Sequence, residues 1–439
     1  MSHLSPAHRA AAGLHADPSL NKSFAATQAA WRFYSNDAVT LPQLAGPLLQ
    51  CARLDVPNAC DQRVLVVLDW SNLHYGGHGN KAGRVGLAHA NDLGYELLTA
   101  LAVSDRDGSP IAPLSLDLRA AGGVHSTRAD APLKTPSVLD GLAPVMQHVN
   151  DLAAPWGKKP LFIIDREGAG KASPADSVGH FRQWDRLGRE YLVRADDRPR
   201  VVHEWITRPL GEVAGLLKRR KAFTHCRPVE FQGKPAEQFV AETAVVLRRP
   251  ARTHRKDKRT GKARHKNVAG APITLRLVVG LVRDQAGKVL ARWLLLTNLP
   301  PSVAAATVAL WYYWRWRIES YHKLLKSAGQ EIECWQQQTP EALARRLTVA
   351  AMACVIVWRL ARDDSPQAAE LRDVLVRLSG RQMKRGKQAR GFTEPALLAG
   401  LGVLIPMLLI LQEYDIDDLR RLTEAMFPNL LPPPRLAEA

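Results

Sequence analysis

RVLVVLD, residues 63–69, is the strongest single indication of the fold class of this chain. It is a short apolar run rich in valine and bounded by turn residues, which is typical of a strand buried in a sheet. KPLFIID (159–165), EYLVRA (190–195) and SLDLRAAG (115–122) are further candidate strands. Helical patterns lie between them, over residues 137–153 and 175–188. Because strands alternate with helices, the sequence predicts an α/β core.

The segments on either side of this core differ from it in character. Residues 1–60 are predicted to be a helical, DNA-binding N-terminal region, and residues 61–200 form the first part of the core. Residues 201–298 are predicted to be β-rich, with a clear hairpin over 273–298 that turns at Asp284–Gly287. Residues 299–336 are expected to hold one helix, capped by Ser302, and residues 337–439 are expected to be helical and to offer a dimerisation surface.

The charge of the chain indicates a polyanionic partner. A formal net charge of +18, in a chain with 46% hydrophobic residues, favours an ordered protein that binds nucleic acid rather than membrane. Eleven tryptophans supply flat faces on which bases could stack. A basic loop is expected from Arg248 to Asn267, with Asp257 as its single acid. It is either a solvated, mobile loop or a clamp on the phosphate backbone, and the sequence leaves both readings open.

Cysteine spacing and hydropathy indicate the compartment. Five scattered cysteines without a CxxC pair are typical of reduced thiols in a cytoplasmic protein and show no zinc pattern. The N-terminus lacks the apolar core of a signal peptide. The apolar run PALLAGLGVLIPMLLIL (395–411) is interrupted by two glycines and a proline, so it is predicted to be a pair of buried helices rather than a membrane span.

YYWRWRIESYHKLLKSAG, residues 312–329, places one acid among aromatic and basic residues. On a helix, Tyr312, Arg315, Glu319 and Lys326 fall within an arc of about 60°. This face is either solvated, with ion pairs four residues apart, or part of a site. Two features elsewhere in the chain favour a site, because Asp69 and Asp165 each end a predicted strand, where α/β proteins bind ligands.

Three carboxylates that meet need cations to remain ionised together. Oxygen ligands favour hard divalent cations, Mg²⁺ or Mn²⁺. Two such ions can clamp a phosphodiester, with one activating water and the other stabilising the leaving oxygen. Asp69, Asp165 and Glu319 are therefore predicted to be metal ligands of a phosphodiester-cleaving enzyme.

A family resemblance supports this hypothesis. The spacing Tyr312-x2-Arg315-x3-Glu319-x6-Lys326 resembles the YREK signature of DDE transposases of the IS-four family. Asp69-Trp70-Ser71 and Asp165-Arg166-Glu167 look like the first and second acid motifs of that family, and WRIESYHK and WLLLTN are also similar to its segments. The resemblance covers roughly residues 25–335.

The resemblance implies an RNase H-like catalytic core that a β-rich insertion domain (201–298) interrupts before Glu319. It implies a bacterial cut-and-paste transposase that uses Mg²⁺, for which Mn²⁺ can substitute, and that pairs two transposon ends as a homodimer before joining them to target DNA. Tyr312, Arg315 and Lys326 would hold phosphates, and Arg166 and Arg194 would contact the backbone. Trp293 would stack a flipped base during hairpin formation; the alternative is an ordinary strand tryptophan packed in the hairpin.

Two other functions stay open on the sequence. A catalytically inactive DNA-binding protein derived from a transposase would keep the basic surface, but it would not need the three acids. A structure-selective RNase H-like nuclease would cut DNA without joining it. A glycosidase carboxylate pair is disfavoured by the net charge of +18.

Overall fold

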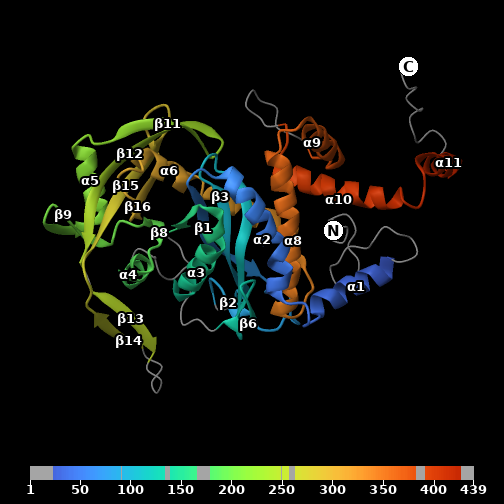
Figure 1. Cartoon of the computed structure of the whole chain (residues 1–439), viewed down its shortest axis with the longest axis horizontal. Coiled ribbons are helices and arrows are strands. Elements are labelled where there is room, and N and C mark those ends of the chain that lie inside the picture. The colour runs from blue at the N-terminus through green and yellow to red at the C-terminus, as the bar shows by residue number, and fades with distance from the viewer. Residues whose placement is uncertain are drawn as a thin grey trace. The chain divides into compact units, whose positions relative to one another are not determined.

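The computed structural model describes residues 23–89, 91–133, 139–165, 178–248, 250–256, 263–381 and 391–426. The chain divides into two compact units, whose helices and strands are labelled in Figure 1. The larger unit comprises Thr40–His322 and Gln338–Val355, and the smaller one comprises Met1–Val39, Lys323–Gln337 and Ile356–Ala439. The fold is mixed α/β, as the sequence predicts.

A mixed sheet forms the centre of the larger unit, and fourteen strands of the described ranges join it. At its middle, β1 (Arg63–His74) is parallel to β7 (Lys159–Ile164), and β7 is parallel to β8 (Glu190–Ala195). On the other side of β1, β3 (Leu93–Ser104) and β4 (Pro110–Ala120) continue the sheet in antiparallel fashion. Val64–Leu68 are 0% exposed, which explains why this strand reads as a continuous apolar run instead of alternating.

The strands of residues 201–298 extend the same sheet beyond β8. β16 (Val289–Thr297) pairs with β8, and then follow β15 (Ile273–Arg283), β12 (Lys234–Leu247), β9 (Arg200–His203) and β10 (Ile206–Pro209), with β11 (Thr224–Phe231) also on β12. The predicted turn between β15 and β16 is confirmed, because Gly287 N–H donates to the Asp284 carbonyl with a left-handed φ of 82° at the glycine. The opposite edge consists of β5 (Gly123–Ser126) and β6 (Ala129–Leu133), and β2 (Val85–Gly86) pairs with β3.

Some helices belong to the larger unit with the sheet, and the described elements of the smaller unit are helical. The larger unit contains α2 (Leu41–Ala59), α3 (Leu142–Ala153), α4 (Val178–Arg186), α5 (Leu210–Arg219) and α6 (Ala305–Tyr313), with short 3₁₀ turns at Leu139–Gly141 and Ala154–Trp156. The remaining elements are α1 (Ser23–Ser35), α7 (Trp316–Leu325), the 3₁₀ turn Ile332–Cys334, α8 (Pro340–Arg362), α9 (Pro366–Leu378), α10 (Glu394–Ile410) and α11 (Ile416–Met426). Helix α2 starts with a capping box in which Thr40 and Gln43 bond reciprocally.

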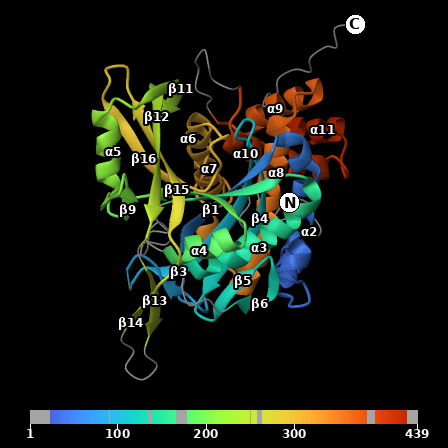
Figure 2. The same ribbon diagram turned by 60° about the vertical axis from the view of Figure 1, so that its left-hand side comes forward.

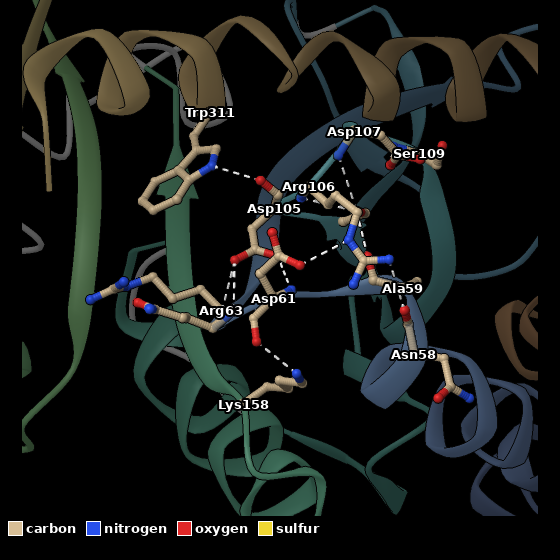
Figure 3. Close-up of polar contacts among 12 residues, drawn as sticks. Asn58, Ala59, Asp61, Arg63, Asp105, Arg106, Asp107, Ser109, Lys158 and Trp311 are labelled. Carbon is tan, nitrogen blue, oxygen red and sulfur yellow. Dashed lines mark hydrogen bonds and ion pairs between the residues drawn. The ribbon is translucent and has the colours of Figure 1, made fainter.

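Asp105, directly after β3, secures the first residues of β1 (Figure 3). Its carboxylate accepts the backbone N–H groups of Asp61, Gln62 and Arg63 at 2.6, 3.1 and 2.9 Å. Its own carbonyl accepts the indole N–H of Trp311 on α6 at 3.1 Å. Three peptide donors and one helix therefore fix the start of β1, and with it the position along the sheet that Asp69 occupies.

Three predictions about local structure are wrong. β1 does not end at Asp69 but continues to His74, because β3 stays paired with it from Thr99 to Gly94. The predicted helix over residues 302–329 is two helices, α6 and α7, with a break at Trp314 and Arg315, where the Arg315 N–H donates to the third carbonyl back along the chain instead of the fourth. Ser302 does not cap α6, which begins after Ala304 without a side-chain cap.

Two longer segments also differ from expectation. The run 395–411 lies in one helix, α10, with Pro406 inside it, and not in a pair of buried helices; Met407 and Leu408 are 44% and 52% exposed. In its described part, the basic segment 248–267 is not a loop, because β13 (Ala251–Lys256) and β14 (Ala263–Val268) pair as an antiparallel ribbon. No helix of the described ranges has the length and apolarity of a membrane span. None of the five cysteines, all of which are described, forms a disulfide.

Candidate active site

Two of the predicted acids meet at the centre of the sheet. The parallel pairing of β1 and β7 ends with Leu68 opposite Ile164. The next residue along each segment is an aspartate: Asp69 within β1, and Asp165 directly after β7. Their side chains are only 11% and 16% exposed. Chain order on two neighbouring parallel strands thus places two carboxylates in a mostly buried position at one point of the sheet.

Arg315, at the break between α6 and α7, joins these acids to the third. Its Nη1 lies 3.0 Å from Asp69 Oδ2 and 3.3 Å from Glu319 Oε1, and its Nη2 lies 3.1 Å from Asp165 Oδ2. The guanidinium is buried (4% exposed), whereas Glu319 is 44% exposed. The structure therefore brings all three predicted acids around one cation, and the cluster keeps an excess of negative charge.

Tyr312 and Arg194 hold Asp165 from the other side. The Tyr312 hydroxyl donates to Asp165 Oδ1 at 3.0 Å, and Arg194 Nη1 donates to the same oxygen at 3.3 Å. Arg194 also lies 3.5 Å from the Tyr312 hydroxyl. Burial, followed by the charge of Asp165, raises the pKa of Tyr312, so the phenol stays a hydrogen-bond donor at neutral pH.

Burial has a strong effect on the carboxyl of Asp69. Burial raises its pKa to about 7, and the charges of Glu319 and Asp165 add to the rise, whereas Arg315 and the backbone N–H of Trp70 oppose it. The Trp70 N–H donates to Asp69 Oδ1 at 2.8 Å. A carboxyl with such a pKa lies where additional positive charge would be stabilising.

The donor set fits a hard divalent cation in type and charge, since it consists of carboxylate oxygens with excess negative charge. In the described ranges, however, no three His, Cys, Asp or Glu side chains are grouped as metal ligands. Arg315 lies among the three acids, and each acid faces the guanidinium. Asp69, Asp165 and Glu319 are the residues that would hold a metal, after Arg315 moves from between them.

Trp293 lies next to this cluster and is buried, with 5% exposure. Its ring centre is 5.5 Å from that of Tyr312 and 6.4 Å from that of Tyr313. Gly280 on β15 faces the ring so closely that an added Cβ would lie 3.2 Å from it. In this state Trp293 packs against α6, and stacking of a base on it stays a prediction.

The roles of two further residues, Lys326 and Arg166, stay predictions. Lys326 belongs to the smaller unit, where its Nζ lies 3.4 Å from Glu333 Oε1. Arg166 lies outside the described residues.

The role of Arg315 as the shared counterion of the acids was not predicted from the sequence. The only sequence signal for this role is the spacing of four residues between Arg315 and Glu319, which predicts a pair on one helix turn. The partners Asp69 and Asp165 come from distant parts of the chain and leave no sequence signal.

No family model matches the chain, and no curated protein matches it. The geometry of the cluster and the spacing of the motif are therefore the grounds on which a function can be assigned.

Proposed function

We propose that this protein is a cut-and-paste DNA transposase with an RNase H-like core. The observation that carries the proposal is the convergence of Asp69, Asp165 and Glu319 on Arg315. These acids come from two strands and a helix that are far apart in sequence, and Tyr312, Arg315 and Glu319 keep the signature spacing. An ordinary solvated helix face would not bury Tyr312 and Arg315 against two strand aspartates.

The residues of the cluster divide the chemistry among them. Asp69, Asp165 and Glu319 would hold Mg²⁺ or Mn²⁺, which activates water and stabilises the leaving oxygen when bound. Tyr312 and Arg194 orient Asp165 through their shared contact with its Oδ1. Arg315, on leaving the acids, would pair with a DNA phosphate, for which its planar fork of donors is suited.

The reaction would proceed by in-line attack on phosphodiesters without a protein-linked intermediate. Water cleaves one strand at the transposon end, and the freed 3′-hydroxyl attacks the opposite strand to close a hairpin. A second hydrolysis opens the hairpin, and the 3′ ends then attack target DNA.

The partner in this proposal is double-stranded DNA, both transposon ends and target, in keeping with the net charge of +18. Two copies of the chain would pair two ends, with residues 337–439 as the proposed dimer surface. The proposed compartment is the bacterial cytoplasm, at the nucleoid.

Cleavage of the flanking DNA tests the proposal. The substrate is a labelled duplex that carries any inverted repeat bordering the gene, incubated with Mg²⁺ and resolved on a denaturing gel. The wild type should give nicked, hairpin and joined products, whereas Asp69→Asn, Asp165→Asn and Glu319→Gln should bind the duplex and lose more than about 100-fold in cleavage rate.

Glu96→Gln is the matched control, because Glu96 is a sheet carboxylate that pairs with Arg119 at 2.8 Å outside the cluster. It should cleave as the wild type does. Cutting without joining would indicate a nuclease, and binding without cutting by the wild type would indicate an inactive derivative. Normal cleavage by Glu319→Gln would refute the assignment of the acids.

A further inference from the structure

A tryptophan projects from the hairpin at one edge of the sheet. β9 and β10 are joined by Glu204 and Trp205, which both adopt left-handed backbone, with φ of 49° and 68°. Two-residue hairpin turns of this kind favour asparagine and glycine, because a bulky side chain is disfavoured at positive φ. Trp205 is nevertheless found there, 92% exposed, and the neighbouring Ile206 is 57% exposed. Packing within the chain therefore does not explain the indole at this position.

The turn that carries Trp205 is held firmly. Arg220 donates to both carboxylate oxygens of Glu204, with Nη2 2.8 Å from Oε2. On the preceding residue, the His203 ring nitrogen Nε2 lies 3.1 Å from the Thr243 hydroxyl on β12. The exposed indole thus stands on a supported turn and not at the end of a loose loop.

A run of cations lies beside this turn, because Arg220, which binds Glu204, belongs to that run. Helix α5 packs against β9 and β10, and Figures 1 and 2 show it beside β9 at this edge of the sheet. Lys218, Arg219 and Lys221 are exposed at the end of α5, on either side of the Arg220 that binds Glu204. Within the described ranges, the ion pairs at this edge include those of Arg208 with Glu212 and Arg220 with Glu204, and none involves these three side chains. The charge of Glu204, the acid of the turn, is balanced by Arg220.

We propose that Trp205 and the stretch Lys218–Lys221 form a second duplex-DNA contact, distinct from the carboxylate cluster. The cations hold phosphates of the DNA backbone, and the indole rests against a base step beside them. Apolar side chains that enter the minor groove in this way unstack a step and bend the duplex. Because the partner is DNA, the inference rests on the proposed function.

Charge favours DNA over a protein as the occupant. Interface cores between proteins are depleted in lysine. A protein partner would have to bury three cations that have no acidic partner among the described residues of this chain. A polyanion meets the same cations favourably and releases counterions on binding. A flat aromatic face is also suited to any base, so binding at this surface would be independent of sequence.

The test is binding of the full chain to a labelled random-sequence duplex, measured by fluorescence anisotropy over a series of salt concentrations. Trp205→Ala should weaken binding about 10-fold without changing the slope of log K against log salt, and Trp205→Phe should lose less. Lys218→Ala/Arg219→Ala should flatten the slope by about 1.8, that is, about 0.9 for each phosphate that is no longer neutralised. A duplex with a dye at each end should also be bent less by Trp205→Ala than by the wild type.

Leu187→Ala is the matched control, since Leu187 is an exposed apolar residue (40%) directly after α4, outside the segments proposed to bind DNA. It should bind as the wild type does. The inference would be overturned if Trp205→Ala bound the duplex with wild-type affinity, or if the double variant kept the wild-type slope. It would also be overturned if Trp205→Ala bound DNA normally but self-associated more weakly than the wild type.

Asp165→Asn separates this inference from the proposed function, because it should keep duplex binding while losing cleavage. If the wild type binds duplex through Trp205 but does not cleave, the surface stands and the transposase proposal fails. If the wild type cleaves transposon ends while Trp205→Ala binds duplex normally, the transposase proposal stands and the surface proposed here fails.

Discussion

Replacing Arg315 with glutamine should make the stability of the larger unit fall steeply as pH rises. Glutamine keeps hydrogen-bond donors but removes the charge that three acids share. Burial already raises the pKa of Asp69 to about 7 with Arg315 opposing the rise, so the variant should raise this pKa further. Below pH 3.8, the pKa of this carboxyl in the unfolded chain, the group is protonated in both states and does not destabilise the fold. As pH rises from 3.8 towards the raised pKa of the folded state, the group destabilises the fold progressively.

The magnitude follows from burial. Removing one partner of a buried ion pair costs about 3–5 kcal/mol. Glu319 is 44% exposed, so its own pairing with Arg315 contributes no more than about 1 kcal/mol, and most of the loss comes from Asp69 and Asp165. We expect a loss of about 3 kcal/mol at pH 8. The loss should be about 1 kcal/mol smaller at pH 6, because Asp69 then holds a proton in both proteins.

Urea denaturation in EDTA at pH 6 and pH 8, followed by tryptophan fluorescence, measures this difference. Arg198→Gln is the matched control, because Arg198 pairs with Asp196 at 2.6 Å but is 82% exposed. Its loss should stay below about 1 kcal/mol at both pH values. If Arg315→Gln were as stable as the wild type, or lost the same amount at both pH values, Arg315 would not be the counterion of Asp69.

Three further predictions concern separate parts of the molecule. Trp293→Ala should nick the first strand at near-normal rates but slow hairpin formation, with a smaller loss for Trp293→Phe; a time course in which both steps fall together would show a packing role only. Neutralising cations within residues 248–267 should flatten the salt dependence of duplex binding by about 0.9 for each phosphate that is no longer bound, and an unchanged slope would show that the segment does not reach DNA. Burial, followed by the charges of Arg346 and Arg84, lowers the pKa of Lys81 to about 8 from 10.5. The wild type should therefore gain stability between pH 8 and 10.5, because Lys81 loses its proton in the folded state at a lower pH than in the unfolded state. Lys81→Met should be more stable than the wild type at pH 7.5 and lack this gain in urea denaturation; the same pH profile in both proteins would contradict the role of Lys81.

The local elements of the core and the spacing of the motif can be predicted from the order of the amino acids alone. The apolar runs at residues 63–69, 159–165 and 190–195 predict the three parallel strands, because strands buried on both faces need apolar residues at every position. Asp165 follows its strand as predicted. The spacing of Tyr312, Arg315 and Glu319 likewise requires no tertiary information.

The surroundings of the acids, in contrast, depend on pairing and packing between distant segments. LGYELLTALAVS forms β3, a strand that was not predicted from the sequence, and its pairing with β1 is what carries that strand past Asp69. Arg315 is buried rather than solvated because its guanidinium meets Asp69, 246 positions away in sequence. Helical periodicity specifies which residues share a face, but the element that this face meets depends on long-range packing. For that reason the sequence predicts the three acids, and the tertiary structure alone shows the cation between them.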